Sequence, residues 1–293
     1  MITLGYKIFR PVDWLIVGFH LLMTLLTLIF RENIPDWQTA FGKYFFSTAA
    51  MILLRAINNR FDRPWLNFVS EWYPILTLPW VYSGTKYFVH ALFPWTIDGL
   101  LHRVDLALLG GDPTLFLRSL GSPWFTDLMQ ASYCLFFTLI FFSCLILYLK
   151  KGRWRFENLQ MIIITALYGT YILFILLPAH SPRFIYYHDL PLNGGWITDT
   201  VRSFIDRTAH RGGAFPSGHA AASVAICVFM WRYARAWSPL FLAVTILLLL
   251  STVYGGYHYV VDLLAGFAYG GVSCILAILW NRHWRKSLDG NFQ

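Results

Sequence analysis

Long apolar runs separated by short polar segments make up most of the chain. A hydrocarbon core about 30 Å thick needs roughly 20 helical residues to cross it. Eight runs approach that length and predict membrane-spanning helices at residues 13–30, 41–57, 73–93, 124–149, 157–178, 217–234, 238–256 and 259–280. The fourth and seventh are the most continuously apolar. Charged or imidazole side chains interrupt the second and third, which leaves an interfacial or re-entrant placement open for both: Lys43, Arg55, Lys86 and His90.

Basic residues gather in the segments that connect alternate runs. With eight spans, all of the following fall on one side: Lys7, Arg10, Arg55, Arg60, Arg63, Lys150, Lys151, Arg153, Arg155, Arg232, Arg235, Arg282, Arg285 and Lys286. The positive-inside rule makes that side cytoplasmic. Removing one span would move some of these residues to the other side. Segments 94–123 and 179–216 and the turn at 255–258 are therefore expected on the extracytoplasmic side.

Composition agrees with an all-α polytopic membrane helix bundle. The 293 residues are 57% hydrophobic and only 13% charged, whereas soluble domains carry about 25% charged residues. This balance excludes a soluble enzyme and a disordered chain. The net charge of +8 is assigned to loops and headgroup contacts, because no basic stretch is interleaved with aromatic residues as nucleic-acid binding would require. The first run is interpreted as a retained span rather than a signal peptide.

Segment 94–123 has a different pattern from the spans. Asp98, His102, Arg103 and Asp105 alternate with leucines, which predicts an amphipathic helix lying in the interface. The sequence Gly-Gly-Asp-Pro at 110–113 is a turn signal that closes it.

Three polar clusters fall on the expected extracytoplasmic face. The first, at 212–219, includes Pro216, Ser217, Gly218 and His219 and opens the sixth span. Proline is favoured in the first turn of a helix, whose free N–H groups and dipole attract anions. Ser217 adds a hydroxyl, and Gly218 would let a bound group approach the backbone. An ordinary helix start with an interfacial histidine is the alternative interpretation.

The second cluster is His258 and Asp262, which open the last span. Positions four residues apart share one helix face. A carboxylate there can accept a hydrogen bond from one imidazole nitrogen and leave the other free to attack. A structural hydrogen bond between helices is the alternative.

The third cluster, at 178–183, ends the fifth span with Arg183. Its planar guanidinium suits phosphate oxygens, although an arginine at headgroup depth can also simply extend to the interface. Together the three clusters supply a helix N-terminus, an arginine and two histidines, which are the components of phosphoryl transfer through a phosphohistidine. No metal-binding motif, Walker loop or Gly-x-Ser-x-Gly sequence is present, and the four cysteines have no metal or redox spacing.

These motifs resemble the type 2 phosphatidic acid phosphatase (PAP2) superfamily over roughly residues 71–280, and more narrowly its branch containing the inositol phosphorylceramide synthases. Pro216–His219 match the Pro-Ser-Gly-His motif. Ser251, His258 and Asp262 match Ser-Arg-x5-His-x3-Asp, although Thr252 replaces the arginine. In the motif Lys-x6-Arg-Pro, Leu176 occupies the lysine position when Arg183 is aligned with the arginine. A further hypothesis is that Arg207 or Arg211 compensates for the positive charges that these two motifs lack.

The resemblance implies a role for each matching residue. His258 would be the nucleophile, Asp262 would orient it, and His219 would be the general acid. Arg183, Ser217 and Gly218 would hold the phosphoryl oxygens. The superfamily requires no metal or cofactor, so none is expected.

The implied protein is a lipid phosphatase or phosphotransferase with a six-helix core, acting on a lipid phosphate ester or pyrophosphate. We expect N-terminal membrane helices at 1–70, a catalytic domain at 71–280 and a cytoplasmic tail at 281–293. The expected location is a bacterial inner membrane with an extracytoplasmic site. Membrane lipids are the other expected partners, and the oligomeric state is open. The alternatives are headgroup transfer to a lipid hydroxyl, a transporter with a His/Asp proton relay, and a scaffold without activity.

Overall fold

The computed structural model describes residues 9–150 and 152–289, with side chains through residue 284, and the regular structure in that part of the chain is helical. The elements are α2 (Pro11–Ile29), α3 (Trp37–Phe61), α4 (Pro64–Leu76), α5 (Leu78–Thr85), α6 (Asp98–Leu109), α7 (Pro113–Ser119), α8 (Pro123–Tyr133), α9 (Leu135–Lys150), α10 (Arg153–Leu176), α11 (Pro182–Ile185), α12 (Trp196–Thr208), α13 (Gly218–Tyr233), η1 (Arg235–Trp237), α14 (Ser238–Tyr254) and α15 (Val260–Asp289). An isolated parallel bridge joins Ala179 to Gly213. The all-α prediction is confirmed.

Five helices are long and apolar enough to cross a bilayer, at Pro11–Ile29, Trp37–Phe61, Arg153–Leu176, Arg235–Tyr254 and Val260–Trp284. Helices α8 and α9 together form a sixth candidate with a bend of 45° between them. Large exposed apolar side chains cover the outer surface, including Leu21, Phe46 and Ile275. These features indicate a multi-pass membrane protein with five or six candidate spans rather than the eight that the sequence predicts.

The difference in span number has local causes. Residues 73–93 do not form one helix, since α4 ends at Leu76 and α5 ends at Thr85. Pro74 lies inside α4 and Pro79 in the first turn of α5, and proline removes a backbone donor and clashes with the preceding turn. Helix α13 has only 16 residues, which corresponds to a rise of about 24 Å. Helix α15 continues past the expected boundary at residue 281.

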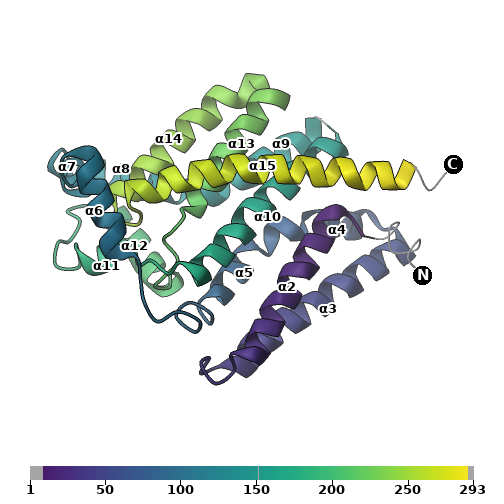
Figure 1. The fold of residues 1–293 in the computed structure, drawn as a ribbon. Coiled ribbons are helices and arrows are strands. Elements are labelled where there is room, and N and C mark those ends of the chain that lie inside the picture. Colours follow the sequence, from purple (N-terminus) through teal and green to yellow (C-terminus); the bar gives the residue numbers. More distant parts are fainter. Residues whose placement is uncertain (1–8, 151, 290–293) are drawn as a thin grey trace.

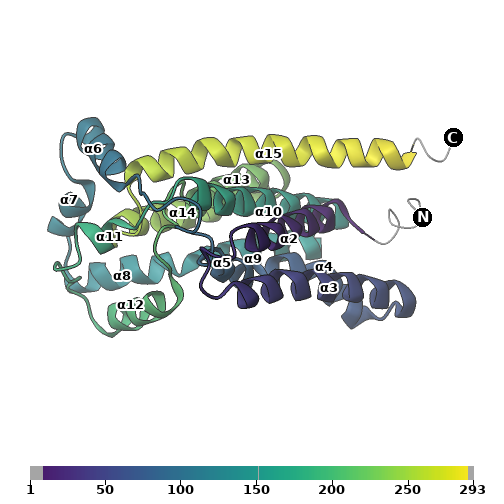
Figure 2. The same ribbon diagram turned by 60° about the horizontal axis from the view of Figure 1, so that its bottom comes forward.

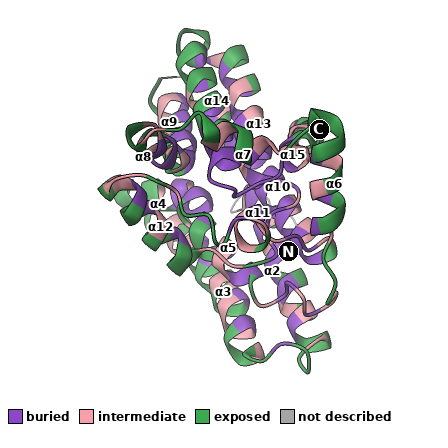
Figure 3. Ribbon diagram, turned by 90° about the vertical axis from the view of Figure 1, so that its left-hand side faces the viewer, coloured by how far each residue is buried: buried purple, intermediate pink, exposed green. Residues whose placement is uncertain are grey.

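Helix α10 occupies the centre of the bundle, and most of its residues are buried (Figure 3). It packs against α13, α15, α9 and α2, while α3 lies along α2 (Figure 1). Helices α13 and α15 approach closely because two glycines four residues apart face the α13 backbone. A Cβ at Gly266 would lie 2.5 Å from the Ser217 carbonyl oxygen, and one at Gly270 would lie 2.6 Å from the Ala221 carbonyl oxygen. Small residues at this spacing are typical of tight helix pairs in membranes.

The starts of α13 and α15 and the ends of α10 and α14 meet at one end of the bundle. Helices α6, α7, α11 and α12 gather at that same end, whereas the start of α2 and the end of α15 lie towards the opposite end (Figures 1 and 2). The segment predicted as an amphipathic helix followed by a turn forms α6 and α7, separated by Gly110 in a left-handed conformation with φ 70°. Asp112 caps α7 by accepting a hydrogen bond from the Leu115 N–H at 2.9 Å.

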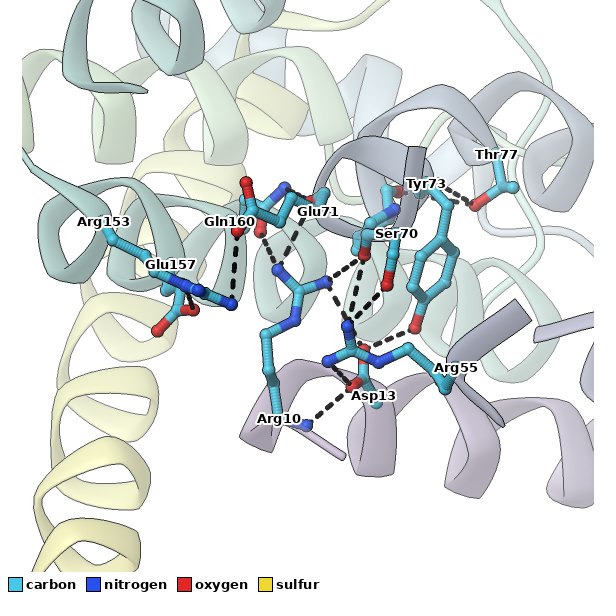
Figure 4. A network of polar contacts seen from close by, with 11 residues as sticks. Arg10, Asp13, Arg55, Ser70, Glu71, Tyr73, Thr77, Arg153, Glu157 and Gln160 are labelled. Carbon is cyan, nitrogen blue, oxygen red and sulfur yellow. Dashed lines mark hydrogen bonds and ion pairs between the residues drawn. The ribbon is translucent and has the colours of Figure 1, made fainter. Parts of the chain in front are cut away.

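A buried polar network lies towards the other end and joins α2, α3 and α4 (Figure 4). The Arg55 guanidinium forms an ion pair with Asp13, whose second oxygen accepts the Tyr73 hydroxyl at 2.6 Å. Arg10 donates to the Ser70 carbonyl oxygen at 2.9 Å. Two of the basic residues expected in cytoplasmic loops, Arg10 and Arg55, are therefore buried partners of a carboxylate. Of the other residues in that set, Lys7 and Lys151 lie outside the described residues, and so do residues 290–293 of the expected tail.

Candidate active site

The loop before α13 places the first polar cluster at the end of the bundle where α6, α7, α11 and α12 gather. Ser217 is the N-cap of α13, and its hydroxyl oxygen accepts a hydrogen bond from the Ala220 N–H at 3.3 Å. Pro216 precedes this cap, so the prediction that it lies in the first helical turn is wrong. The first helical residue is Gly218, which is buried against α10, where a Cβ would approach the Thr170 hydroxyl at 3.3 Å. Glycine at this position therefore allows close packing between α13 and α10.

A tight turn between α14 and α15 positions the second cluster. The Thr252 carbonyl oxygen accepts the N–H groups of Tyr257 at 2.8 Å and His258 at 3.2 Å. Gly256 has a φ of 69°, which favours glycine. The Thr252 side chain is buried and its hydroxyl donates to the Leu249 carbonyl oxygen. The residue that replaces the expected arginine thus anchors the turn through its backbone and brings no positive charge.

The structure brings both histidines and the aspartate together. His219 Nδ1 lies 3.1 Å from His258 Nε2, and His258 Nδ1 lies 3.3 Å from Asp262 Oδ2. The Ser217 N–H donates to the Asp262 carbonyl oxygen at 3.0 Å and ties the two helix starts to each other. Asp262 is fully buried and His258 is 5% exposed. The three side chains form a continuous chain of hydrogen bonds across two helices.

The hydrogen bonds and the burial together define the state of His258. Burial lowers the pKa of His258 to about 4, so the imidazole is neutral near pH 7. A carboxylate beside Nδ1 favours the tautomer with its proton on that nitrogen. Nε2 then carries the lone pair, and His219 Nδ1 is the donor in the bond between the rings. This arrangement suits a nucleophile at Nε2 of His258 with a proton donor beside it.

Arg183 adjoins this site without touching the imidazoles. Its backbone N–H donates to the Gly256 carbonyl oxygen at 2.8 Å, and its Nη1 donates to Asp206 at 2.7 Å. The guanidinium lies over the rings of Phe184 at 4.2 Å and Tyr257 at 5.4 Å. Its Nε and Nη2 atoms are buried and have no partner in the described part of the chain. The third cluster therefore retains two donors next to the turn between α14 and α15.

The other two arginines considered as replacements differ in position. Arg211 lies over the Phe184 ring at 5.2 Å, close to Arg183. Arg207 is exposed in the last turn of α12. Proximity to Arg183 favours Arg211 over Arg207 as a contributor of positive charge.

Two carboxylates on α6 support the site and are absent from the residues predicted to act there. Asp105 accepts the first N–H groups of α15, from Val260 at 2.7 Å and Val261 at 2.8 Å. Asp98 accepts the Tyr259 hydroxyl at 3.2 Å and His180 Nδ1 at 3.1 Å. Their seven-residue spacing on an amphipathic helix is the signal that could have found them, because it puts both on one face. That face packs on α15.

No group of three or more His, Cys, Asp or Glu side chains is placed to hold a metal ion among the described residues. The site consists of two imidazoles, one carboxylate, a helix N-terminus and a neighbouring guanidinium. These groups can take up a phosphoryl group, move a proton to a leaving oxygen and stabilise the oxyanion.

Comparison with known proteins gives an independent result. A family model described as the PAP2 superfamily matches residues 100–276, which is more than half of the chain. A PA-phosphatase related-family protein of Dictyostelium discoideum is 29% identical over 196 residues, covering 58% of this chain and 34% of that protein. The chain therefore aligns with about a third of this relative's length. No solved structure matches.

Proposed function

Since this chain belongs to the PAP2 superfamily, we propose that it is an integral-membrane lipid phosphatase or phosphotransferase that works through a phosphohistidine. Its substrate is a lipid phosphate ester or pyrophosphate. The hydrogen-bonded series His219–His258–Asp262 is the observation that carries the proposal. The proposed catalytic domain is residues 71–280, preceded by N-terminal helices at 1–70, of which α2 packs on α10 and α3 on α4, and followed by a tail at 281–293.

The reaction begins with attack of His258 Nε2 on phosphorus. A nitrogen–phosphorus bond forms while the bond from phosphorus to the leaving oxygen breaks. His219 acts as the imidazolium, which the charge of the bound phosphate dianion favours, and it gives its Nδ1 proton to that oxygen and becomes neutral. Asp262 stabilises the positive imidazole that results. Water then gives a proton to His219 and attacks phosphorus, the bond to Nε2 breaks, and inorganic phosphate leaves. An alcohol in place of water gives a transferase product.

Phosphoryl oxygens are held by groups that surround the imidazoles. The first-turn N–H groups of α13, beginning with Gly218, have no partners within the helix, and the Ser217 hydroxyl retains its proton for donation. Arg183 supplies the two unpartnered donors described above. The 3.1 Å contact between the rings leaves no room for phosphorus, so the substrate must displace the His219 ring towards the leaving oxygen.

Hydrolysis is the activity to test first, because water reaches the phosphoenzyme whenever no other acceptor is bound. Basic residues at the ends of α10 and α13 away from the site, Arg153, Arg155 and Arg232, support an extracytoplasmic site, and a bacterial inner membrane is the proposed location. Headgroup transfer to a lipid hydroxyl, as in inositol phosphorylceramide synthases, remains the alternative within the superfamily.

The proposal is tested with the purified full chain in detergent, a panel of lipid phosphates and diphosphates, and candidate alcohol acceptors. Free phosphate and new lipid products are both measured, with and without EDTA. We expect turnover that EDTA leaves unchanged and that His258→Ala abolishes. His283→Ala is the matched control, since His283 is exposed on the same helix α15. Equal turnover by wild type and His258→Ala would contradict the proposal. Loss of turnover in EDTA that a divalent cation restores would contradict the metal-free mechanism.

A further inference from the structure

A partly open cavity of about 160 Å³ lies beside the catalytic turn and is lined by α7, α11, α12, the loop that follows α11 and the turn itself. Among its lining residues are Arg118, Arg183, Arg202, Asp206, Tyr187 and Tyr257. Neither His219 nor His258 lines it. The cavity is thus separate from the imidazole pair, although Arg183 adjoins both.

The charge of this cavity is strongly unbalanced. Three guanidinium groups line it against one carboxylate, that of Asp206, which is paired with Arg183. Arg118 donates to three carbonyl oxygens, those of Tyr254, Gly255 and Leu190, and lies over the Tyr187 ring at 5.0 Å. Arg202 makes no hydrogen bond or ion pair with any described residue. Two positive charges therefore remain without an anionic partner, and clustered guanidinium groups favour phosphate-like oxyanions.

Short connections join the cavity to the catalytic turn. Gly255 and Tyr257 line it directly, and Tyr257 immediately precedes His258. Arg118 donates to the carbonyl oxygens of Tyr254 at 3.0 Å and Gly255 at 3.2 Å, so the guanidinium lies against the turn itself. The Tyr257 ring contacts Tyr133, with centroids 4.4 Å apart, and Tyr133 contacts His219 at 5.1 Å. Arg183 lines the cavity and also donates its backbone N–H to the Gly256 carbonyl oxygen, so it borders both the cavity and the turn.

We propose that this cavity is a second anion site, which binds a phosphate group other than the one transferred to His258. Two sources share that chemistry: the second phosphate of a lipid diphosphate, and inorganic phosphate. The inference rests on the proposed function for its place in the reaction, while anion binding itself does not depend on turnover. Arg202 determines the preference for diphosphate over monophosphate substrates. Its guanidinium bonds to no described residue and is therefore free to bind the second phosphate.

The test compares Arg202→Gln with Arg207→Gln, which removes the same charge from an exposed position on the same helix α12. For each protein we measure kcat/KM with a lipid monophosphate and with the diphosphate of the same lipid, and the inhibition constant of inorganic phosphate. If the site takes the second phosphate of the substrate, Arg202→Gln lowers the diphosphate-to-monophosphate ratio by about tenfold or more, the value of one charge-assisted hydrogen bond. If it takes inorganic phosphate, the ratio holds and the inhibition constant rises by a similar factor.

Arg207→Gln should change neither quantity. An Arg202→Gln protein whose ratio and inhibition constant both equal those of Arg207→Gln would overturn the second site. Stabilisation of the protein by pyrophosphate against thermal unfolding provides a readout without turnover, and we expect Arg202→Gln to lose it. If wild type hydrolyses no lipid phosphate yet shows this stabilisation and its loss, the proposed function fails and the anion site stands. If wild type hydrolyses lipid phosphates but neither readout responds to Arg202→Gln, only the anion site fails.

Discussion

The imidazoles of His219 and His258, 39 residues apart in the chain, share a hydrogen bond of 3.1 Å. Each lies near the start of a helix, and the two helices pack closely through Gly266 and Gly270. The relation between the rings is therefore set by backbone packing and by the turn that the Thr252 carbonyl oxygen holds. Chemistry at this pair depends on groups that fix the two helix starts as much as on the rings themselves.

Removing the charge of Asp262 should reduce catalysis far more than folding. Asp262→Asn places an amide next to His258 Nδ1, and the amide NH₂ favours the tautomer with the proton on Nε2, which cannot attack phosphorus. A comparable change in a Ser-His-Asp triad lowers kcat about 10⁴-fold, and we expect a loss of at least about 10²-fold here. Steady-state kinetics of lipid phosphate hydrolysis measure it. Unaltered kcat would show that the tautomer is set by another group.

Asp105 should act as a positioning residue. Asp105→Asn loses one of the two carboxylate acceptors for the Val260 and Val261 N–H groups. One charge-assisted bond corresponds to about tenfold, so we expect kcat to fall by about that factor while KM stays nearly constant, since Asp105 does not touch the substrate. Asp199→Asn, at an exposed position of α12, is the control. A rise in KM with constant kcat would instead place Asp105 in substrate binding.

The buried network at the opposite end should contribute to stability. Asp13→Asn leaves the Arg10 and Arg55 guanidinium groups buried without a counter-charge, and breaking a buried pair in this way costs about 3–5 kcal/mol. Glu157→Gln, which loses an ion pair with the largely exposed Arg153, should cost about 1 kcal/mol or less. Denaturant unfolding in detergent measures both. Similar costs for the two variants would mean that the network is solvated.

Acidification should destabilise the protein in part through His258. Its pKa is lowered to about 4 in the folded chain, against about 6.5 for an unperturbed histidine. Above about pH 6.5 both states are neutral and the stability is fully present. As the pH falls from 6.5 towards 4, the unfolded chain binds a proton that the folded chain does not, so the free energy of unfolding decreases. His258→Asn should show a smaller decrease over this range, and parallel curves for the two proteins would contradict the assignment.

Local sequence signals predicted the parts of the site that lie within one turn of a helix. The four-residue spacing of His258 and Asp262 depends only on neighbouring residues, and the contact it predicts occurs in the structure. The turn at 110–113 likewise separates two helices as its glycines and proline indicate. The superfamily, too, could be predicted from these motifs.

Features that depend on distant partners could not be predicted in this way. Arg10 and Arg55 have the appearance of loop charges until Asp13 is seen between them. The role of Asp105 requires knowing that α6 crosses the start of α15, and the position of Arg118 requires knowing that α7 packs on the α14–α15 turn. The third predicted span was wrong as one helix because Pro74 and Pro79 outweighed its apolar composition.

Direct detection of the phosphoenzyme tests the central claim. The protein is mixed with a ³²P-labelled lipid phosphate, quenched in alkali within milliseconds to seconds, digested, and analysed for the labelled peptide. We predict label on the imidazole of His258, stable to base and lost in acid, at a level that rises in His219→Gln if dephosphorylation is slowed more than phosphorylation. Label on another side chain, or full turnover with none on His258, would contradict the account.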